Sequence, residues 1–524
     1  MPKEYSMSSV PSSQAASKEL TIQIVREPAH THMTPRKRDV CLMFGIPPCP
    51  TAATIVDGLT VSLRPGSITY ITGPSGSGKS STLRRIAEER ADAISVGQGR
   101  FPRDRAIVDA VAQRRPLRSA MEILCACGLS EPAAWIRRFD ELSEGEKMRA
   151  ALARAIGIAV SASASRPILC DEFAAALHDR LAATLAHNLR RLATRFNLTL
   201  VLAGTRDAIR SHLHADRVIR LGGEAPILEE RTPGSEPPPR LDDPCIEPGC
   251  IRDYHAFARM HYRMQDALGF VDRVFTLCDR PRGDRIGVCV LAHAPRELAL
   301  RNIATRGRFN GDPRRLNREL RIIRRLVIHP DFRSCGLGHW FVRQILPQAG
   351  VRFVECLAVM GAVIPVFEKA GMTRVGQCPL PRGRLALVDR MLSLGLDPAS
   401  PDFSSRIKRN PRVRALVERT LVEWLSRMQS ASRWRLDNRS AEELSDAFRR
   451  AIGRPPVYYL WDREGEFPVI CLNHGGLSHE LSGTTASCEE RSRERQRHDP
   501  NAPEKHKSAR RERELRRPDR QSGP

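Results

Sequence analysis

The chain has 524 residues, too many for a single hydrophobic core, so two or three domains are expected. Its 41% hydrophobic and 27% charged residues are ordinary for a soluble globular protein, and no run approaches the roughly 18 apolar residues needed to cross a bilayer. The formal net charge is +24, and the stretch from Cys488 onward, with twelve basic and eight acidic residues, accounts for only +4 of it. The body is therefore basic, which suits a nucleic-acid partner, although solvated surface arginines would give the same charge.

The ends of the chain and one internal stretch differ in composition from the rest. Residues 1–20 and 476–524 are polar and poor in aromatic residues, so we predict that both are disordered. The first twenty residues contain no apolar stretch of the secretory type, so the fourteen cysteines are expected to be thiols in the cytoplasm. Residues 231–245 are rich in proline and are predicted to be a linker.

Three folded pieces are predicted between these stretches. Residues 21–230 alternate strands with helices, as a mainly parallel α/β sheet does. Residues 246–395 contain strands in adjacent pairs and are predicted to form an α+β domain. Residues 396–475 are predicted to be a small helical segment, in which Ser440 and Glu443 form a capping box.

A phosphate-binding loop follows the predicted strand SITYIT and precedes a predicted helix. Its sequence is GPSGSGKS, and the strand–loop–helix context is the one that a P-loop requires. Main-chain N–H groups and the helix N-terminus would surround the β-phosphate, Lys79 would bridge the β- and γ-phosphates, and the Ser80 hydroxyl would bind Mg²⁺. The predicted ATP-binding residues of this segment are Gly73, Pro74, Ser75, Gly76, Ser77, Gly78, Lys79, Ser80 and Ser81.

Two carboxylates end the predicted strand PILC. Asp171 is placed to hold the water shell of the magnesium ion, and Glu172 is placed to polarise the attacking water. Gln113 is the candidate for a glutamine that senses Mg²⁺, although a plain helix end explains it equally well. The predicted metal site consists of Ser80, Asp171 and Gln113.

The segment LSEGEKMRAALARAI, between the P-loop and these carboxylates, resembles the signature of the ATP-binding cassette (ABC) family, whose usual form is Leu-Ser-Gly-Gly-Gln. The resemblance implies that Ser143 and the Gly145 backbone bind the γ-phosphate held by the P-loop of a second copy, so that a homodimer encloses two ATP molecules. Glu144 and Glu146 replace a glycine and a glutamine of the signature. These two negative charges are expected to weaken the grip on the phosphate.

Two further positions depart from the ABC pattern. The family's histidine after the last core strand is absent, and Thr205 or Arg206 stands there instead; His178 replaces the usual aspartate. Slow hydrolysis is therefore expected. Only 64 positions separate Lys79 from Ser143, a short span for the helical subdomain that contacts membrane partners. A transporter role is accordingly disfavoured, and no membrane partner is predicted.

A second glycine loop lies in RRLVIHPDFRSCGLGHWFVRQIL, which resembles motif A of the GNAT acetyltransferases. The resemblance implies that the loop binds the pyrophosphate of acetyl-CoA and that the end of the preceding strand pairs with the pantetheine amides. The strand FVECLAVM and the segment PVFEKAGMTRVG also match the family. The implied cofactor-binding residues are Leu326, Val327, Ile328, Arg333, Ser334, Cys335, Gly336, Leu337 and Gly338.

The acid–base residue of a transferase is harder to assign. The tyrosine that GNAT enzymes often use is replaced by Phe367. Glu355 is preferred because a carboxylate within an apolar strand needs a reason, and Tyr262 is the second choice. His261 and His329 stay open as alternatives. A zinc site of two cysteines and two histidines at positions 245–261 is disfavoured, because only four residues separate the two pairs.

The whole architecture resembles a family described as an ABC-type ATPase fused to a predicted GNAT acetyltransferase. The hypothesis is an ATP-hydrolysing protein coupled to acetyl-CoA-dependent N-acetylation of nucleic acid, such as tRNA or a DNA base. Residues 306–325, with eight arginines and two acids, would carry the positive charge near the acceptor. The alternatives are a protein or small-amine acetyltransferase with a regulatory ATPase, a sensor that only binds nucleotide and cofactor, and a non-transporter ABC ATPase without acyl transfer.

Overall fold

The structure is a computed structural model that describes residues 18–465, apart from 28–30, 50, 100, 163–164, 224, 232–242, 262–267, 281–282, 379–381, 427–438 and 454. The described residues belong to one compact unit, Met1–Glu480. In this part of the chain, no helix combines the length and the apolar character needed to cross a membrane.

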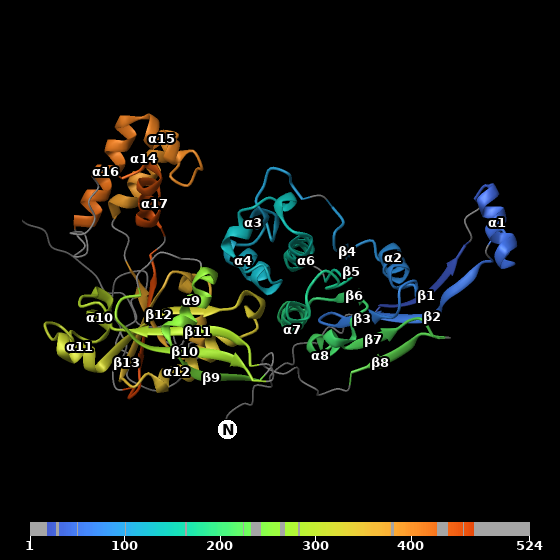
Figure 1. The fold of residues 1–524 in the computed structure, drawn as a ribbon, viewed down its shortest axis with the longest axis horizontal. Helices are drawn as coiled ribbons and strands as arrows, with labels where there is room; N and C mark the ends of the chain where they lie inside the picture. Colours follow the sequence, from blue (N-terminus) through green and yellow to red (C-terminus); the bar gives the residue numbers. More distant parts are fainter. Residues whose placement is uncertain are drawn as a thin grey trace, which may run out of the picture. The chain divides into compact units, whose positions relative to one another are not determined.

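The elements are shown in Figure 1. The strands are β1 (Lys18–Arg26), β2 (Ala53–Leu63), β3 (Ile68–Thr72), β4 (Ile94–Ser95), β5 (Ile168–Cys170), β6 (Leu200–Gly204), β7 (Arg217–Arg220), β8 (Ile227–Glu230), β9 (Pro244–Gly249), β10 (Val271–Asp279), β11 (Arg285–Ala292), β12 (Leu320–Ile328), β13 (Phe353–Ala358), β14 (Thr373–Gln377) and β15 (Val457–Asp462). The longer helices are α1 (Pro35–Phe44), α2 (Lys79–Glu89), α4 (Leu117–Ala126), α6 (Glu144–Ser161), α7 (Asp179–Phe196), α12 (Leu337–Ile345), α14 (Arg382–Ser393), α16 (Pro411–Ser426) and α17 (Ala441–Ile452). The shorter ones are α3 (Ile107–Ala110), α5 (Pro132–Trp135), α8 (Arg210–Leu213), α9 (Ile251–Phe257), α10 (Ala299–Ala304), α11 (Pro313–Glu319), α13 (Val366–Lys369) and α15 (Phe403–Arg409), with 3₁₀ turns η3 (Ala258–Met260) and η4 (Pro330–Phe332).

The first domain is built on a six-stranded sheet, called here the front sheet, in the order β4-β5-β6-β3-β7-β8. The first five strands are parallel and β8 is antiparallel to β7. A separate antiparallel pair, β1 and β2, accompanies it. The predicted mainly parallel α/β sheet is therefore present.

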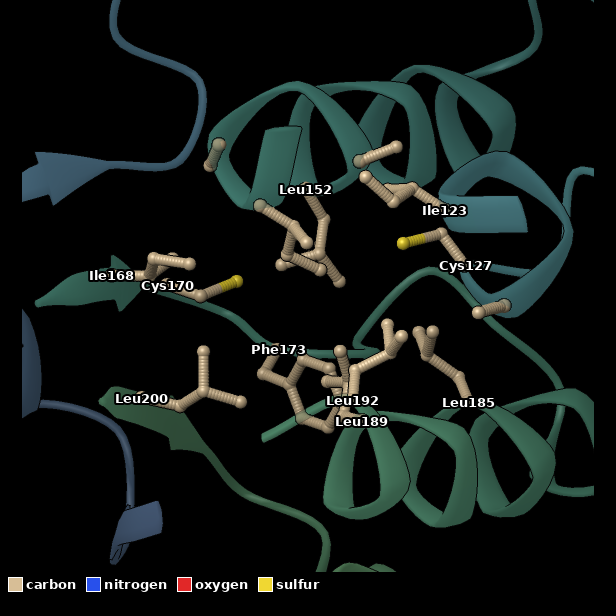
Figure 2. Close-up of a cluster of buried hydrophobic side chains, with 14 of the residues drawn as sticks. Ile123, Cys127, Leu152, Ile168, Cys170, Phe173, Leu185, Leu189, Leu192 and Leu200 are labelled. Carbon is tan, nitrogen blue, oxygen red and sulfur yellow. The ribbon is translucent and has the colours of Figure 1, made fainter. Parts of the chain in front are cut away.

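Alternate residues of the front-sheet strands face opposite layers, as the two-residue period of a strand requires. In β6, Leu200 and Leu202 face the cluster formed with α4, α6 and α7, whereas Val201 and Ala203 face α2, β1 and β2. Figure 2 shows the first cluster, with Ile168 and Cys170 of β5 opposite residues of α6 and α7. Because both faces are covered, the central strands β5 and β6 contain no polar side chain.

The second domain is built on a seven-stranded sheet, the rear sheet, in the order β14-β15-β13-β12-β11-β10-β9. Only β12 and β13 run parallel; every other neighbouring pair is antiparallel. Helix α12 packs on one face through Phe341, Val342 and Ile345. The strands before α12 match the predicted α+β pattern of adjacent pairs.

The parallel pair β12 and β13 separates along its length. The two strands pair from Leu320↔Phe353 to Ile323↔Cys356, and the pairing then stops although β12 continues to Ile328. On its other side β12 stays paired with β11 to the end, with a register shift around Arg324. Such a bulge bends a strand and increases its twist, which accounts for the divergence. The last five residues of β12 thus leave their β13-facing edge outside the ladder.

Several predicted boundaries shift. Strand β1 begins at Lys18, inside the predicted disordered start, and β9 begins at Pro244, inside the predicted linker. The range predicted to be helical, 396–475, contains α15–α17 with their own small core, but it also contains β15, which lies between β13 and β14 in the rear sheet. Helix α14 begins earlier than this range. The predicted tail 476–524 lies outside the described residues.

Candidate active site

The P-loop connects β3 to α2, as the sequence predicts. Residues 73–78 form the turn, and Lys79, Ser80 and Ser81 make up the first turn of α2. Gly73, Gly76 and Gly78 have φ values of 151°, 82° and 95°, a region that other residues rarely adopt. A Cβ atom at Gly73 would lie 2.3 Å from the Leu221 carbonyl oxygen. The loop therefore needs glycine both for its path and for its close packing.

The polar groups of the loop suit a bound phosphate. Lys79 Nζ donates to the carbonyls of Gly73 and Pro74, both at 2.7 Å, which holds the ammonium group over the loop. The Ser77 hydroxyl is buried and has no hydrogen-bond partner among the described residues. An orphan buried hydroxyl is costly unless a ligand or water satisfies it. These residues fit ATP, and Ser80 is the residue that would hold Mg²⁺; when bound, the nucleotide would supply the phosphoanhydride and the metal would neutralise its charge.

The two predicted carboxylates lie at the same edge of the sheet as the P-loop. Asp171 and Glu172 follow β5 directly, and β5 and β3 are parallel neighbours of β6. The carboxyl ends of parallel strands meet at one edge, which is where ligands bind in such sheets. Both side chains are exposed, and Asp171 Oδ1 accepts the Glu172 N–H at 2.9 Å. Glu172 has φ 46°, a strained value that fixes the turn.

Two further positions predicted to lie near the ATP site are Gln113 and Arg206. Gln113 is exposed in a turn after α3, so its role as a metal ligand stays a prediction. Arg206, at the position where the resemblance expects histidine, donates to Asp179 at 3.1 Å and to the Ala175 carbonyl at 3.2 Å. The Tyr70 hydroxyl donates to the Arg206 carbonyl at 3.0 Å. A fixed cation thus replaces the titratable ring at the end of β6.

The predicted signature segment begins α6. Ser143 is the N-cap residue, and Gly145 lies in the first turn. Glu146 Oε2 accepts both the Ser143 N–H and the Ser143 hydroxyl at 2.9 Å, a capping box. Partial burial raises the pKa of Glu146, but these hydrogen bonds from Ser143 outweigh it, so the net pKa is lowered and the carboxylate stays charged. The hydroxyl predicted to bind phosphate is therefore occupied by a neighbouring anion.

The second glycine loop joins β12 to α12 through η4. Gly336 is the N-cap of α12 with φ 91°, and Ser334 also has a positive φ of 69°. A Cβ atom on Gly338 would meet Val366 and Ile328 at 3.7 and 3.9 Å, ordinary contact distances. The loop thus places main-chain N–H groups of a helix head beside the end of β12. The predicted cofactor residues thus lie at the end of β12 and in the segment that leads into the first turn of α12.

The side chain of Arg333, one predicted ligand of the cofactor in this loop, already donates hydrogen bonds within the protein. Arg333 was expected to contribute to the pyrophosphate cradle, but its guanidinium donates to the carbonyls of Ile328 at 2.9 Å and Met260 at 2.7 Å. Burial lowers the pKa of Arg333. Its side chain therefore fastens the loop to the end of β12 and to η3. Its main-chain N–H also donates, to the Pro330 carbonyl at 3.2 Å.

The structure corrects the predicted role of Glu355. It was predicted to be the catalytic residue, but its side chain is completely buried and forms a bidentate ion pair with Arg301, with Nη2–Oε1 at 2.7 Å and Nε–Oε2 at 2.8 Å. The Tyr458 hydroxyl donates to the same carboxylate at 2.9 Å. Burial and the neighbouring Glu355 raise the pKa of Tyr458 well above its usual value. A carboxylate that accepts three hydrogen bonds in the core is a structural group and not a base open to substrate.

The remaining candidates are settled only in part. Tyr262 lies outside the described residues. His329 follows β12, its Nδ1 accepts the Asp331 N–H at 3.3 Å, and burial lowers its pKa, so the ring is neutral at pH 7. Phe367 is buried in the core of the rear sheet. In the described ranges no group of three or more His, Cys, Asp or Glu residues could hold a metal ion.

The front sheet, its P-loop and the paired carboxylates define a P-loop ATPase. Comparison with known proteins agrees: residues 63–211 match the model of the AAA domain. An aliphatic sulfonates import ATP-binding protein of Delftia acidovorans is 31% identical over 213 residues, which cover 37% of this chain and 83% of that protein. The chain belongs to the family of ABC-type ATP-binding proteins, so the predicted ABC ATPase is confirmed.

Two further likenesses are partial. An Fe(3+) ions import ATP-binding protein of Rhodococcus jostii (strain RHA1) is 33% identical over 197 residues, covering 32% of this chain and 55% of that protein. The chain thus spans about half the length of this relative. A solved dimeric ATP-binding cassette with bound ADP and Pi has 20% sequence identity and a TM-score of 0.28, and it covers 34% of this chain and 92% of its own.

Proposed function

We propose that the protein couples an ABC-type ATP cycle to acyl transfer from acetyl-CoA to an amine. The observation that carries the second half of this proposal is the opening between β12 and β13, with a glycine-bearing helix head at the end of β12. A pantetheine arm contains two amides, which need main-chain partners when buried. Beyond Ile323, β12 leaves the ladder with β13 and continues as an extended strand whose main chain can provide such partners. Two carbonyls of this stretch already accept side-chain hydrogen bonds, that of Arg324 from Arg325 and that of Ile328 from Arg333. The α12 N-terminus offers N–H groups and positive potential to the pyrophosphate.

The chemistry needs little from the side chains. A neutral amine attacks the thioester carbonyl, the new N–C bond forms as the C–S bond breaks, and the amine proton passes to the departing thiolate. Acetyl-CoA supplies the activated acyl group when bound. The protein's contribution is to hold the thioester between the diverging strands and to orient it by the loop of residues 333–338. We assign no general base, because Glu355 is enclosed by Arg301 and Tyr458.

We propose nucleic acid as the acceptor. The supporting surface is the basic stretch of residues 306–325, in which Arg306, Arg314 and Arg318 are exposed. Part of the stretch is already neutralised: Arg308, Arg315 and Arg318 all pair with Glu319, at 2.9, 3.4 and 3.5 Å. The surplus charge is therefore smaller than the sequence count suggests. It still favours a polyanion over a neutral small amine.

The acceptor class can be tested directly. Full-length protein is incubated with ATP, Mg²⁺ and acetyl-CoA labelled in the acetyl group, together with cellular RNA, DNA and protein in separate reactions. We expect stable label in a nucleic-acid fraction and none when acetyl-CoA is labelled only in its adenosine. Label in protein alone would support the rival protein acetyltransferase. No transfer to any fraction, with ATP hydrolysis intact, would overturn the transferase proposal.

The ATP cycle is proposed to include a homodimer in which Ser143 of one copy meets the γ-phosphate bound by the other. The capping box opposes this, because Glu146 occupies the Ser143 hydroxyl and adds a negative charge. We expect Glu146→Gln to strengthen ATP-dependent dimerisation by roughly fivefold, about 1 kcal/mol. Analytical ultracentrifugation with ATP measures this.

Glu144→Gln is the matched control for this variant. This substitution removes the same charge from the same turn of α6. The Glu144 side chain, however, is 83% exposed and pairs with Lys147 at 2.7 Å. The control should therefore change dimerisation much less. Equal effects of the two variants, or weaker dimerisation of Glu146→Gln, would contradict the proposed role of Ser143.

A second candidate function is an ATPase subunit of an importer, which the names of the relatives favour. Against it stands the small size of the segment between α2 and α6, whose helices α3, α4 and α5 have 4, 10 and 4 residues. This surface would have to bind a membrane partner. Coenzyme A binding by the purified protein separates the two proposals, because an importer subunit has no use for it.

A further inference from the structure

We infer that α7 of the ATPase domain is a positioning element for the proposed coenzyme A loop and links the occupancy of the two sites. This inference rests on the proposed function. Two side chains of α7 reach the loop: Asn188 Nδ2 donates to the Arg333 carbonyl at 3.3 Å, and Arg191 Nη1 donates to the Ser334 carbonyl at 2.6 Å. The carbonyls of two consecutive residues of the proposed coenzyme A loop thus accept hydrogen bonds from the domain that contains the P-loop.

These contacts fix the direction of the main-chain N–H groups of the loop. In a trans peptide the C=O of one residue and the N–H of the next point in opposite directions. With the Arg333 and Ser334 carbonyls directed at α7, the N–H groups of Ser334 and Cys335 are directed away from it. Ser334 has φ 69°, a conformation that a residue with a side chain keeps only where its surroundings impose it. The two donors from α7 are part of those surroundings.

The start of α7 contacts the same region. His178, its N-cap, lies with Nε2 3.4 Å from Asp331 Oδ2, and Arg180 forms an ion pair with Asp284. The Arg180 guanidinium also lies over the Phe332 ring, 5.4 Å from its centroid. Together with Asn188 and Arg191, these contacts extend over the first thirteen residues of α7. The helix therefore follows the loop from η4 to the residues just before the head of α12.

The same helix is fastened to the ATP site. Residues 173–178 run directly from Glu172 to the start of α7. Phe173, the residue after Glu172, is buried in one cluster with Leu185, Leu189 and Leu192 of α7 (Figure 2). Close-packed interiors transmit displacements instead of absorbing them. A change in the turn at Glu172 on nucleotide binding would therefore reach Asn188 and Arg191, which lie on the turns of α7 that carry these leucines.

A link of this kind must be reciprocal. If ATP alters the orientation of the loop and so the affinity for coenzyme A by some factor, coenzyme A must alter the affinity for ATP by the same factor. Arg191 is the best residue to remove, because its side chain is exposed and its loss leaves no cavity. Arg195, one turn later on α7, provides the matched control: it is also exposed, and it pairs with Glu122 of the ATPase domain instead of the loop.

The experiment is calorimetric titration of the full chain with coenzyme A, with and without a non-hydrolysable ATP analogue and Mg²⁺. We expect the analogue to change the wild-type affinity for coenzyme A. Arg191→Ala should weaken coenzyme A binding about tenfold, the loss of one charge-assisted hydrogen bond, and abolish the effect of the analogue. Arg191→Lys should restore part of both. Arg195→Ala should behave as wild type, and the affinity of Arg191→Ala for the analogue alone should be unchanged.

The outcomes separate the two levels of the proposal. If wild-type protein does not bind coenzyme A, the proposed function itself fails. If it binds but Arg191→Ala and Arg195→Ala match wild type, the acyl-transfer proposal stands and the role of α7 is overturned. If Arg191→Ala binds more weakly while the analogue has no effect on wild type, α7 positions the loop but the link between the sites is overturned.

Discussion

Replacing Glu172 with glutamine is expected to reduce steady-state ATP hydrolysis by at least about 100-fold, the usual contribution of a positioned general base, while ATP binding is retained. The reason is its place: Glu172 follows β5 at the edge where the P-loop lies, its side chain is exposed, and its strained backbone fixes the turn. A glutamine keeps the shape but cannot accept a proton from water. Phosphate release and binding of a fluorescent ATP analogue are the two measurements.

Two further variants serve as comparisons for Glu172→Gln. Lys79→Ala should lose binding as well as hydrolysis, because the ammonium group over the P-loop is removed. Glu88→Gln on α2, a carboxylate that is 55% exposed and pairs with Arg85, should leave both unchanged. A wild-type protein that binds ATP without hydrolysing it would instead support a nucleotide sensor. Hydrolysis by Glu172→Gln at the wild-type rate would remove Glu172 from the mechanism.

Local patterns were enough to predict the strand–loop–helix of the P-loop and the position of Asp171 and Glu172 after β5. A P-loop depends on glycines, a lysine and a hydroxyl that are adjacent in the sequence, and the paired carboxylates end a short apolar strand. Each of these two motifs can therefore be recognised without knowing the fold. The partner of Ser143 was not foreseen, although the Ser-x-x-Glu spacing of a capping box was present at residues 143–146.

Contacts between distant residues account for what was missed. The strand VYYLWD of β15 enters the rear sheet between β13 and β14, about eighty to a hundred residues away in the chain, and its position after a helical stretch concealed this pairing. The donors on α7 that hold residues 333 and 334 are about 145 positions away. Neither periodicity nor a motif indicates such a partner.

Glu355 shows both the strength and the limit of sequence reasoning. A carboxylate in the apolar strand FVECLA does need a reason, and the sequence suggested catalysis. The reason in the structure is Arg301, on α10 and 54 residues earlier, together with Tyr458 of β15. Burial lowers the pKa of Arg301, but its ion pair with Glu355 outweighs this and raises the net pKa. Arg301 is therefore charged at neutral pH.

We expect Glu355→Ala to destabilise the rear sheet by about 3–5 kcal/mol, because it leaves a buried guanidinium without its counter-ion. The double variant Arg301→Leu with Glu355→Leu should recover much of that loss, since it removes both charges and fills the space with apolar atoms. Local stability is best measured by amide hydrogen exchange of the β13 and β15 peptides, because a chain with several domains need not unfold in a single step. Exchange in Glu355→Ala should be faster by two orders of magnitude or more.

The front sheet provides the internal control, since β3 and β6 share no contact with this ion pair and should exchange as in wild type. The same experiment separates the structural role from the catalytic one. A structural Glu355 predicts that stability and acyl transfer fall together and that both return in the double variant. If Glu355→Ala left exchange in β13 unchanged and abolished acyl transfer alone, the carboxylate would act on substrate. The ion pair with Arg301 would then have to open during turnover, at a cost that the complete burial of both side chains makes large.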